Sequence, residues 1–172
     1  HDHVCRKLVN NSNFDVISVD YSLAPESPFP AAVEEAIETL RWLDSEHKEI
    51  KINPEKILIC GDSAGGNLAS VLSIYNRDKL KYNIKFQILI YPVTDFSSNF
   101  PSKKKYDGLI LSKDLMQWFE KKYLPQNIRE KHLNDWKLSP IKASSLSNLP
   151  RTLLILAECD PLFDEGRYFF SN

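Results

Sequence analysis

Hydrophobic residues recur along the chain in two alternating patterns, which predict strands and helices in turn. Short apolar runs rich in β-branched residues are typical of strands, and they lie at 14–20, 56–60, 86–92 and 151–157. Apolar residues spaced three and four apart are typical of helices, and they lie at 4–9, 31–47, 67–76, 113–123 and 164–170. The alternation predicts an α/β fold, because each crossover is long enough to leave neighbouring strands parallel.

One connection is much longer than the others. Residues 93–150 hold a single clear helical pattern, at 113–123, between two predicted strands. Connections of this length are uncommon in compact domains unless they carry a function. We therefore expect this stretch to form a lid or the wall of a substrate pocket.

The sequence around Ser63 carries the strongest chemical signal. A predicted strand ends in Gly61-Asp-Ser63-Ala-Gly65, and a predicted helix follows. This Gly-x-Ser-x-Gly pattern is typical of a nucleophile elbow, a sharp turn from which the serine hydroxyl projects. We expect Gly61 and Gly65 to be glycines because a side chain at either position would collide with neighbouring backbone. The backbone N–H of Ala64, at the start of the new helix, is a candidate oxyanion donor.

A glycine-rich turn between a strand and a helix has other uses. It can simply pack, or it can hold a phosphate at the helix start. A phosphate loop ends in Gly-Lys-Ser or Gly-Lys-Thr, and the sequence after Gly65 lacks that ending. The pattern therefore favours a nucleophile.

The composition argues against a nucleic-acid-binding protein and against a membrane helix in this sequence. The chain of 172 residues is 42% hydrophobic and 26% charged, with a net charge of −1. It has no basic excess for nucleic acid and no apolar run near the ~20 residues of a membrane helix. Cys5, Cys60 and Cys159 are an odd number in unrelated settings. We expect Cys60 and Cys159 to be reduced core residues, which favours a reducing, cytoplasmic compartment.

A serine nucleophile needs a base, and the base needs an orienting carboxylate. Asp160 follows the predicted strand 151–157, where parallel sheets present their functional loops. Glu158 and Asp164 are competitors, and Asp164 also stands where a helix N-cap is wanted.

The four histidines do not supply the base. They are His1, His3, His47 and His132. None follows Asp160 in the sequence, as the base of an α/β-hydrolase does. We expect His47 to end a surface helix and His132 to be exposed, and we assign none to a triad. No glycine-rich loop for a second oxyanion donor precedes Phe14 either. We expect the sequence to be an internal portion of a longer protein, cut at both ends.

Together these motifs resemble the hormone-sensitive-lipase-like family of α/β-hydrolases, which includes carboxylesterases and relatives of arylacetamide deacetylase. The matching pieces are VDYSLAPE (19–26), FPAAV (29–33), GDSAGGNLA (61–69), LIYPVTD (89–95), SP (139–140) and DPLFDEG (160–166). They follow the family order over nearly the whole chain. One departure is Ser22, where the family usually has arginine, and we expect it to affect local stability only.

The resemblance implies a partial α/β-hydrolase fold, with helices on both faces of a parallel sheet. It implies a helical cap at about 97–150, in which Trp118, Phe119 and Tyr123 are candidates for an acyl pocket or for plain core. It also implies Ser63 as nucleophile, Asp160 as triad carboxylate and Ala64 N–H as oxyanion donor, with the triad histidine beyond Asn172.

The function that follows from the resemblance is a serine hydrolase of small or medium carboxylic esters, with no metal or organic cofactor. The alternative is a non-catalytic binder of small molecules, because the family also includes plant gibberellin receptors that lack the catalytic histidine. These 172 residues alone are expected to show almost no triad-dependent turnover.

Overall fold

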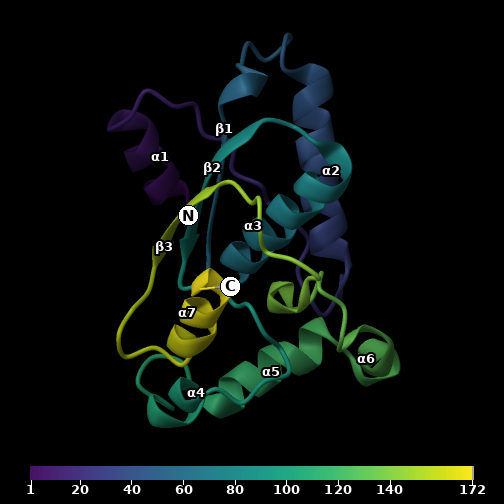
Figure 1. The fold of residues 1–172 in the computed structure, drawn as a ribbon, viewed down its shortest axis with the longest axis vertical. Helices are drawn as coiled ribbons and strands as arrows, with labels where there is room; N and C mark the ends of the chain where they lie inside the picture. Colours follow the sequence, from purple (N-terminus) through teal and green to yellow (C-terminus); the bar gives the residue numbers. More distant parts are fainter. Residues whose placement is uncertain (172) are drawn as a thin grey trace.

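The computed structural model describes residues 1–171, which are built around a three-stranded parallel sheet. The strands are β1 (Ile57–Asp62), β2 (Ile84–Ile90) and β3 (Arg151–Ile155), and β2 lies in the middle (Figure 1). Asp62 pairs with Ile90, which pairs in turn with Ile155, so the carboxyl ends of all three strands meet at one edge of the sheet. The loops that follow β1, β2 and β3 therefore lie together.

Helices separate and cover the strands, as the sequence pattern predicted. They are α1 (Asp2–Asn10), α2 (Ala31–Glu46), α3 (Ala64–Tyr75), α4 (Pro101–Lys105), α5 (Lys113–Tyr123), α6 (Gln126–His132) and α7 (Phe163–Ser171). Short 3-10 helices lie at Pro54–Lys56 and Pro140–Lys142, and a single π-helical turn, Asn76–Leu80, extends α3. This is the predicted parallel α/β sheet flanked by helices.

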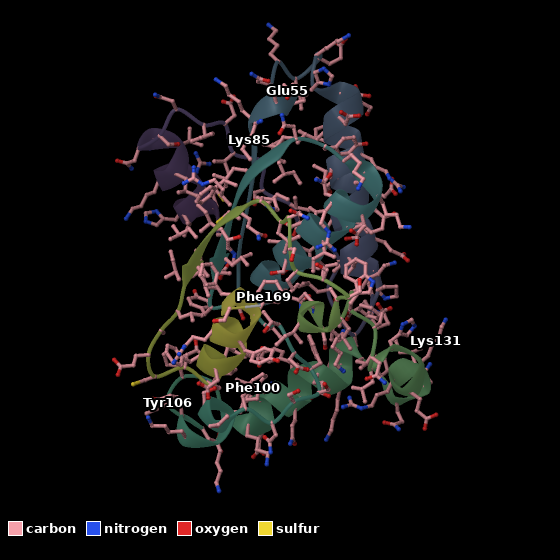
Figure 2. The ribbon with its side chains drawn as sticks, in the orientation of Figure 1. Glu55, Lys85, Phe100, Tyr106, Lys131 and Phe169 are labelled. Atoms are coloured by element: carbon pink, nitrogen blue, oxygen red, sulfur yellow. The ribbon has the colours of Figure 1, made fainter. Side chains whose placement is uncertain are left out.

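One face of the sheet is buried beneath α3 and α7. Ala69 of α3, Leu89 of β2 and Phe169 of α7 form one core cluster, and Figure 2 labels Phe169. A second cluster fills the space between α2 and α3, where Val33 and Val71 are each 1% exposed. Burying such side chains contributes ~1.5–3 kcal/mol each, and this packing fixes α3 under the strand ends.

The opposite face of the sheet lies toward α1 and is more open. His1 contacts Asp62 at the end of β1, while Leu153 and Ile155 on β3 are each 45% exposed. Cys60 is exposed on this face, and Cys159 is exposed in the loop after β3. Both thiols are free, but the prediction that they belong to the core was wrong. Strand residues alternate between the two faces, and Cys60 points to the open face, while Cys159 lies beyond the end of β3.

The apolar run 14–20 is not a strand. No backbone ladder joins it to another strand within the described residues 1–171, and Phe14 is 53% exposed. A strand exists only through hydrogen bonds to a neighbour, so a β-branched composition without a partner leaves an extended, unpaired segment.

The long connection, residues 93–150, is ordered. It contains α4, α5, α6 and a 3-10 turn, and α5 has the bounds that the spacing predicted. The sequence pattern predicted only one helix in this stretch and therefore missed α4, α6 and the 3-10 turn. Among residues 1–171, no helix has the length and apolarity needed to cross a membrane.

Candidate active site

Ser63 lies at a sharp turn between β1 and α3. Its backbone has φ +52° and ψ −115°, a conformation that L-residues rarely adopt and that is worth ~1–3 kcal/mol of strain. The surrounding backbone fixes it: the Ser63 N–H donates to the Ile90 carbonyl at 2.9 Å, and the Ser63 carbonyl accepts from Asn67 and Val93 at 3.1 and 3.2 Å. The turn has the shape expected of a nucleophile elbow.

Two glycines allow this turn, and only one of them, Gly61, belongs to the pair that the motif suggested. A Cβ on Gly61 would come within 2.1 Å of the Gly65 carbonyl oxygen, and one on Gly66 within 2.8 Å of Pro92 Cβ. At Gly65 the nearest atom would be 3.9 Å away, an ordinary contact. The predicted collision at Gly65 was therefore wrong, because the close approach is between α3 and the segment after β2.

Ala64 opens α3 directly after Ser63. The first N–H groups of a helix have no acceptor inside it, and the helix dipole places partial positive charge there. The Ala64 residue is exposed and lines the same cavity as Ser63. Its N–H can therefore stabilise negative charge that forms beside the Ser63 hydroxyl.

Ser63 and Ala64 open onto a cavity of about 970 Å³. Its other walls include the loop at residues 21–24, residues 95–99, Lys103 and Lys104 of α4, and α5. Tyr21 on this wall is a protonated donor at neutral pH, since burial and then the charge of Asp62 raise the pKa of its phenol. The cavity thus brings the serine together with segments far apart in the sequence.

Three aromatic residues of α5 line the cavity. Trp118 and Phe119 are each 53% exposed, so they are not plain core. Tyr123 belongs to the cavity wall and to the core, because it lines the cavity and packs edge-on against Phe29 with ring centroids 5.8 Å apart. Burial raises the pKa of the Tyr123 phenol, so it stays protonated.

Asp160 lies in the loop after β3, at the same sheet edge as Ser63. It is half-buried, and its Oδ1 accepts the Leu162 N–H at 2.8 Å. It is not among the residues that line the cavity, although Leu162 is. Because β2 separates β1 from β3, Ser63 and Asp160 follow strands that lie ~10 Å apart.

The competing carboxylates differ from Asp160. Asp164 is the second residue of α7 rather than its N-cap, and its Oδ2 accepts the Ser102 N–H at 2.8 Å. Glu158 is exposed.

The histidines make their contacts with residues other than the two predicted catalytic ones. His1 Nε2 is 3.0 Å from Asp62, and His47 Nδ1 is 2.6 Å from the Asp44 carbonyl. His132 is half-buried rather than exposed, because its ring packs edge-on against Phe29 with centroids 5.1 Å apart. Within residues 1–171, no histidine hydrogen-bonds to Ser63 or Asp160. The same residues contain no cluster of three histidine, cysteine or acidic side chains able to hold a metal ion.

Ser22 stands where the family usually has arginine, and its backbone hydrogen-bonds to Glu35. Its N–H donates to Glu35 Oε2 at 2.7 Å, and hydrogen bonding from Ser22 lowers the pKa of Glu35. The effect of replacing the family's arginine on stability stays a prediction.

Two polar side chains around the site were not anticipated. Asn67 is 4% exposed, and its Nδ2 donates to the carbonyls of Val93 and Leu138 at 2.8 and 3.0 Å. Glu165 is fully buried at the start of α7. Nothing in the spacing of polar residues marks either one, because their partners are distant in the sequence.

Comparison with known proteins gives a consistent result. A model of the α/β hydrolase fold family matches residues 1–171. An ethyl acetate hydrolase of Pseudomonas putida is 35% identical over 170 residues, covering 96% of this chain and 52% of that protein. The carboxylic ester hydrolase LipN of Mycobacterium tuberculosis is 39% identical, covering 98% of this chain and 46% of that protein.

Solved structures agree. The hyperthermophilic esterase of Pyrobaculum calidifontis superimposes with a TM-score of 0.91 at 45% identity, over 98% of this chain and 54% of that one. The chain therefore spans about half the length of the curated relatives it matches.

Proposed function

The chain belongs to the α/β-hydrolase fold family, and from this premise we propose that its protein is a serine hydrolase of carboxylic esters. The observation that carries the proposal is the strained backbone of Ser63, at φ +52°, on the floor of the 970 Å³ cavity. The names of the relatives, a carboxylic ester hydrolase and an ethyl acetate hydrolase among them, support carboxylic esters as the substrate class.

In the proposed reaction the Ser63 hydroxyl attacks the ester carbonyl. The carbonyl oxygen becomes an oxyanion, which the Ala64 N–H stabilises at the positive end of α3. Collapse of this intermediate expels the alcohol and leaves an acyl group on Ser63. Water then attacks the acyl-enzyme and releases the carboxylic acid.

Proton transfer in this scheme needs a histidine. The family resemblance implies one outside residues 1–172, with Asp160 as the carboxylate that orients it. A half-buried carboxylate at the shared sheet edge suits that role, because it can hold the imidazole in one tautomer and stabilise its charged form.

We propose that residues at about 97–150 act as the cap over the reacting ester. The exposed rings of Trp118 and Phe119 on the cavity wall offer apolar surface to an acyl chain. The volume and the largely apolar lining favour small and medium esters.

The test is Ser63→Ala in the full-length protein, assayed on p-nitrophenyl butyrate. Loss of the nucleophile is expected to lower kcat at least about a thousandfold, with an unchanged melting temperature. Ser144→Ala is the matched control, because Ser144 is exposed and lies outside the cavity.

Unchanged hydrolysis by Ser63→Ala contradicts the proposal. Absence of hydrolysis by the unmodified full-length protein, together with saturable binding of small acids or esters, supports instead the non-catalytic binding relative that the sequence left open.

A further inference from the structure

A fully buried carboxylate lies in the first turn of α7. Glu165 has no exposed surface, and its Oε1 accepts the backbone N–H groups of Thr94 and Asp95 at 2.8 and 3.3 Å. Its Oε2 is 2.7 Å from Lys103 Nζ. Burial raises the pKa of Glu165, and the Lys103 charge and these N–H donors act against that rise. A buried carboxylate keeps its charge only while such partners compensate for the loss of water.

The Lys103 ammonium lies among three oxygen atoms at this point. The Lys103 side chain comes from α4, and its ammonium donates to the carbonyls of Asp95 and Ser98 at 3.0 and 3.1 Å and forms the ion pair with Glu165 Oε2. An ammonium has three N–H donors, and three acceptors surround this one. The pair therefore joins three segments: α4, the stretch directly after β2, and α7.

A second set of contacts stands beside the pair. The Ser102 hydroxyl donates to the Pro161 carbonyl at 2.7 Å, and the Ser102 N–H donates to Asp164 at 2.8 Å. The rings of Phe100 and Tyr168 lie 6.1 Å apart between the same two helices. Figure 1 shows α4 beside α7, and Figure 2 labels Phe100 at the start of α4. Residues 100–103 thus hold the loop that contains Asp160 from one side.

The Lys103–Glu165 pair also connects to the turn that carries Ser63. Thr94, held by Glu165, directly follows Val93, whose N–H donates to the Ser63 carbonyl at 3.2 Å. One carboxylate therefore holds both the segment that contacts the serine backbone and the helix that begins three residues after Asp160.

Resting on the function proposed above, we infer that Glu165, paired with Lys103, is a positioning residue that fixes the Asp160 loop relative to the Ser63 turn. Glu165 reaches neither the cavity nor a reacting atom; it acts through Thr94, Asp95 and the start of α7.

Replacing one residue of the Lys103–Glu165 pair has a predictable effect on the other. Lys103→Met leaves the Glu165 carboxylate buried without its counter-charge, so the loops must move to admit water or the carboxyl must take up a proton. Lys103→Met with Glu165→Gln removes both charges and keeps an oxygen to accept the Thr94 N–H. The double variant is therefore expected to recover what the single variant loses.

The experiment compares these variants in the full-length protein. Hydrolysis of p-nitrophenyl butyrate is measured as kcat per serine titrated with a phosphonate ester, and KM and thermal unfolding are recorded in parallel. Lys131→Met is the matched control for the loss of a charge, because Lys131 is exposed on α6 and lies outside the cavity. Lys103 itself lines the cavity, and the double variant, which changes the cavity wall in the same way as Lys103→Met, separates that effect from the loss of the ion pair.

Lys103→Met is expected to lower kcat about tenfold or more, with a smaller change in KM, because small displacements of catalytic groups have large effects on rate. The double variant is expected to return to within about threefold of the unmodified protein. If Lys103→Met does not fold, Glu165→Gln alone is the test, with a kcat at least about threefold lower.

A kcat per titrated serine within about twofold of the unmodified protein in Lys103→Met or Glu165→Gln overturns the inference, as does a double variant no better than Lys103→Met. Failure of the proposed function is a separate result, because it appears as full activity in Ser63→Ala.

Discussion

The turn around Ser63 and the long connection at residues 93–150 are held by different kinds of contact. At the turn, backbone meets backbone: a Cβ on Gly61 would approach the Gly65 carbonyl oxygen to 2.1 Å, and the Ser63 N–H and carbonyl are both hydrogen-bonded. The long connection is held by side chains from elsewhere, among them Asn67 and Glu165.

This difference explains why the two regions differ in what their sequences reveal. Backbone crowding demands glycine at positions 61 and 66, at fixed distances from Ser63, so the turn has a local pattern that can be recognised. A side-chain contact to a distant backbone carbonyl places no constraint on neighbouring residues, so the long connection shows only one helix in its pattern. The difference between the two regions also predicts that substitutions in them change stability by different amounts.

The largest effect is expected at the turn. Gly61→Ala places a methyl group against the Gly65 carbonyl oxygen, which cannot rotate away, and the free energy of unfolding is expected to fall by more than about 3 kcal/mol. Gly65→Ala is the control, since its Cβ would find no atom nearer than 3.9 Å, and a change below about 1 kcal/mol is expected. Urea unfolding of the full-length variants measures both. Equal losses would remove the distinction between the two glycines.

A smaller effect is expected where the two regions meet. Asn67→Leu removes both amide donations and leaves the half-buried Val93 carbonyl and the buried Leu138 carbonyl without that partner, which costs about 1–3 kcal/mol. Asn127→Ala, on the exposed side of α6, is expected to change stability by less than about 0.5 kcal/mol. Thermal unfolding compares them, and a neutral Asn67→Leu would show that the long connection does not depend on this link.

The smallest effect concerns pH and the segment after β2. Burial alone raises the pKa of Asp95, but hydrogen bonds from Ser97 and Ser98 outweigh it and lower the pKa below its ordinary value. The native state then binds fewer protons than the unfolded chain near this pKa. The stabilising contribution of Asp95 is therefore present above its unfolded pKa of about 4 and lost as pH falls through the folded pKa.

Asp95→Asn is expected to flatten this acid limb. Unfolding free energies of both proteins, measured between about pH 6 and pH 3, are expected to converge at the acid end. A difference that stays constant with pH would show that the carboxylate of Asp95 adds nothing through its ionisation.

Periodicity predicted most of the fold because it records which residues face a core. α5 begins and ends where the spacing of three and four placed it, and β1 to β3 follow the apolar runs. The same signal failed at residues 14–20 and at Cys60, since an apolar residue does not reveal whether a neighbour covers it.

The site was predictable only in part, for a related reason. The turn at Ser63 follows from a local motif, and the position of Asp160 after β3 follows from the strand order. Glu165 and Lys103 meet across 61 intervening residues, and neither belongs to a pattern that predicts the contact. Such pairs become visible only in three dimensions.

The most direct test of the central claim is covalent trapping of the nucleophile in the full-length protein. A p-nitrophenyl alkylphosphonate transfers its phosphonyl group to an activated serine and releases nitrophenol. Peptide mapping by mass spectrometry then identifies the modified residue. We predict a single adduct on Ser63, formed together with complete loss of ester hydrolysis. An adduct on another residue, or ester hydrolysis that continues with Ser63 modified, would contradict the account.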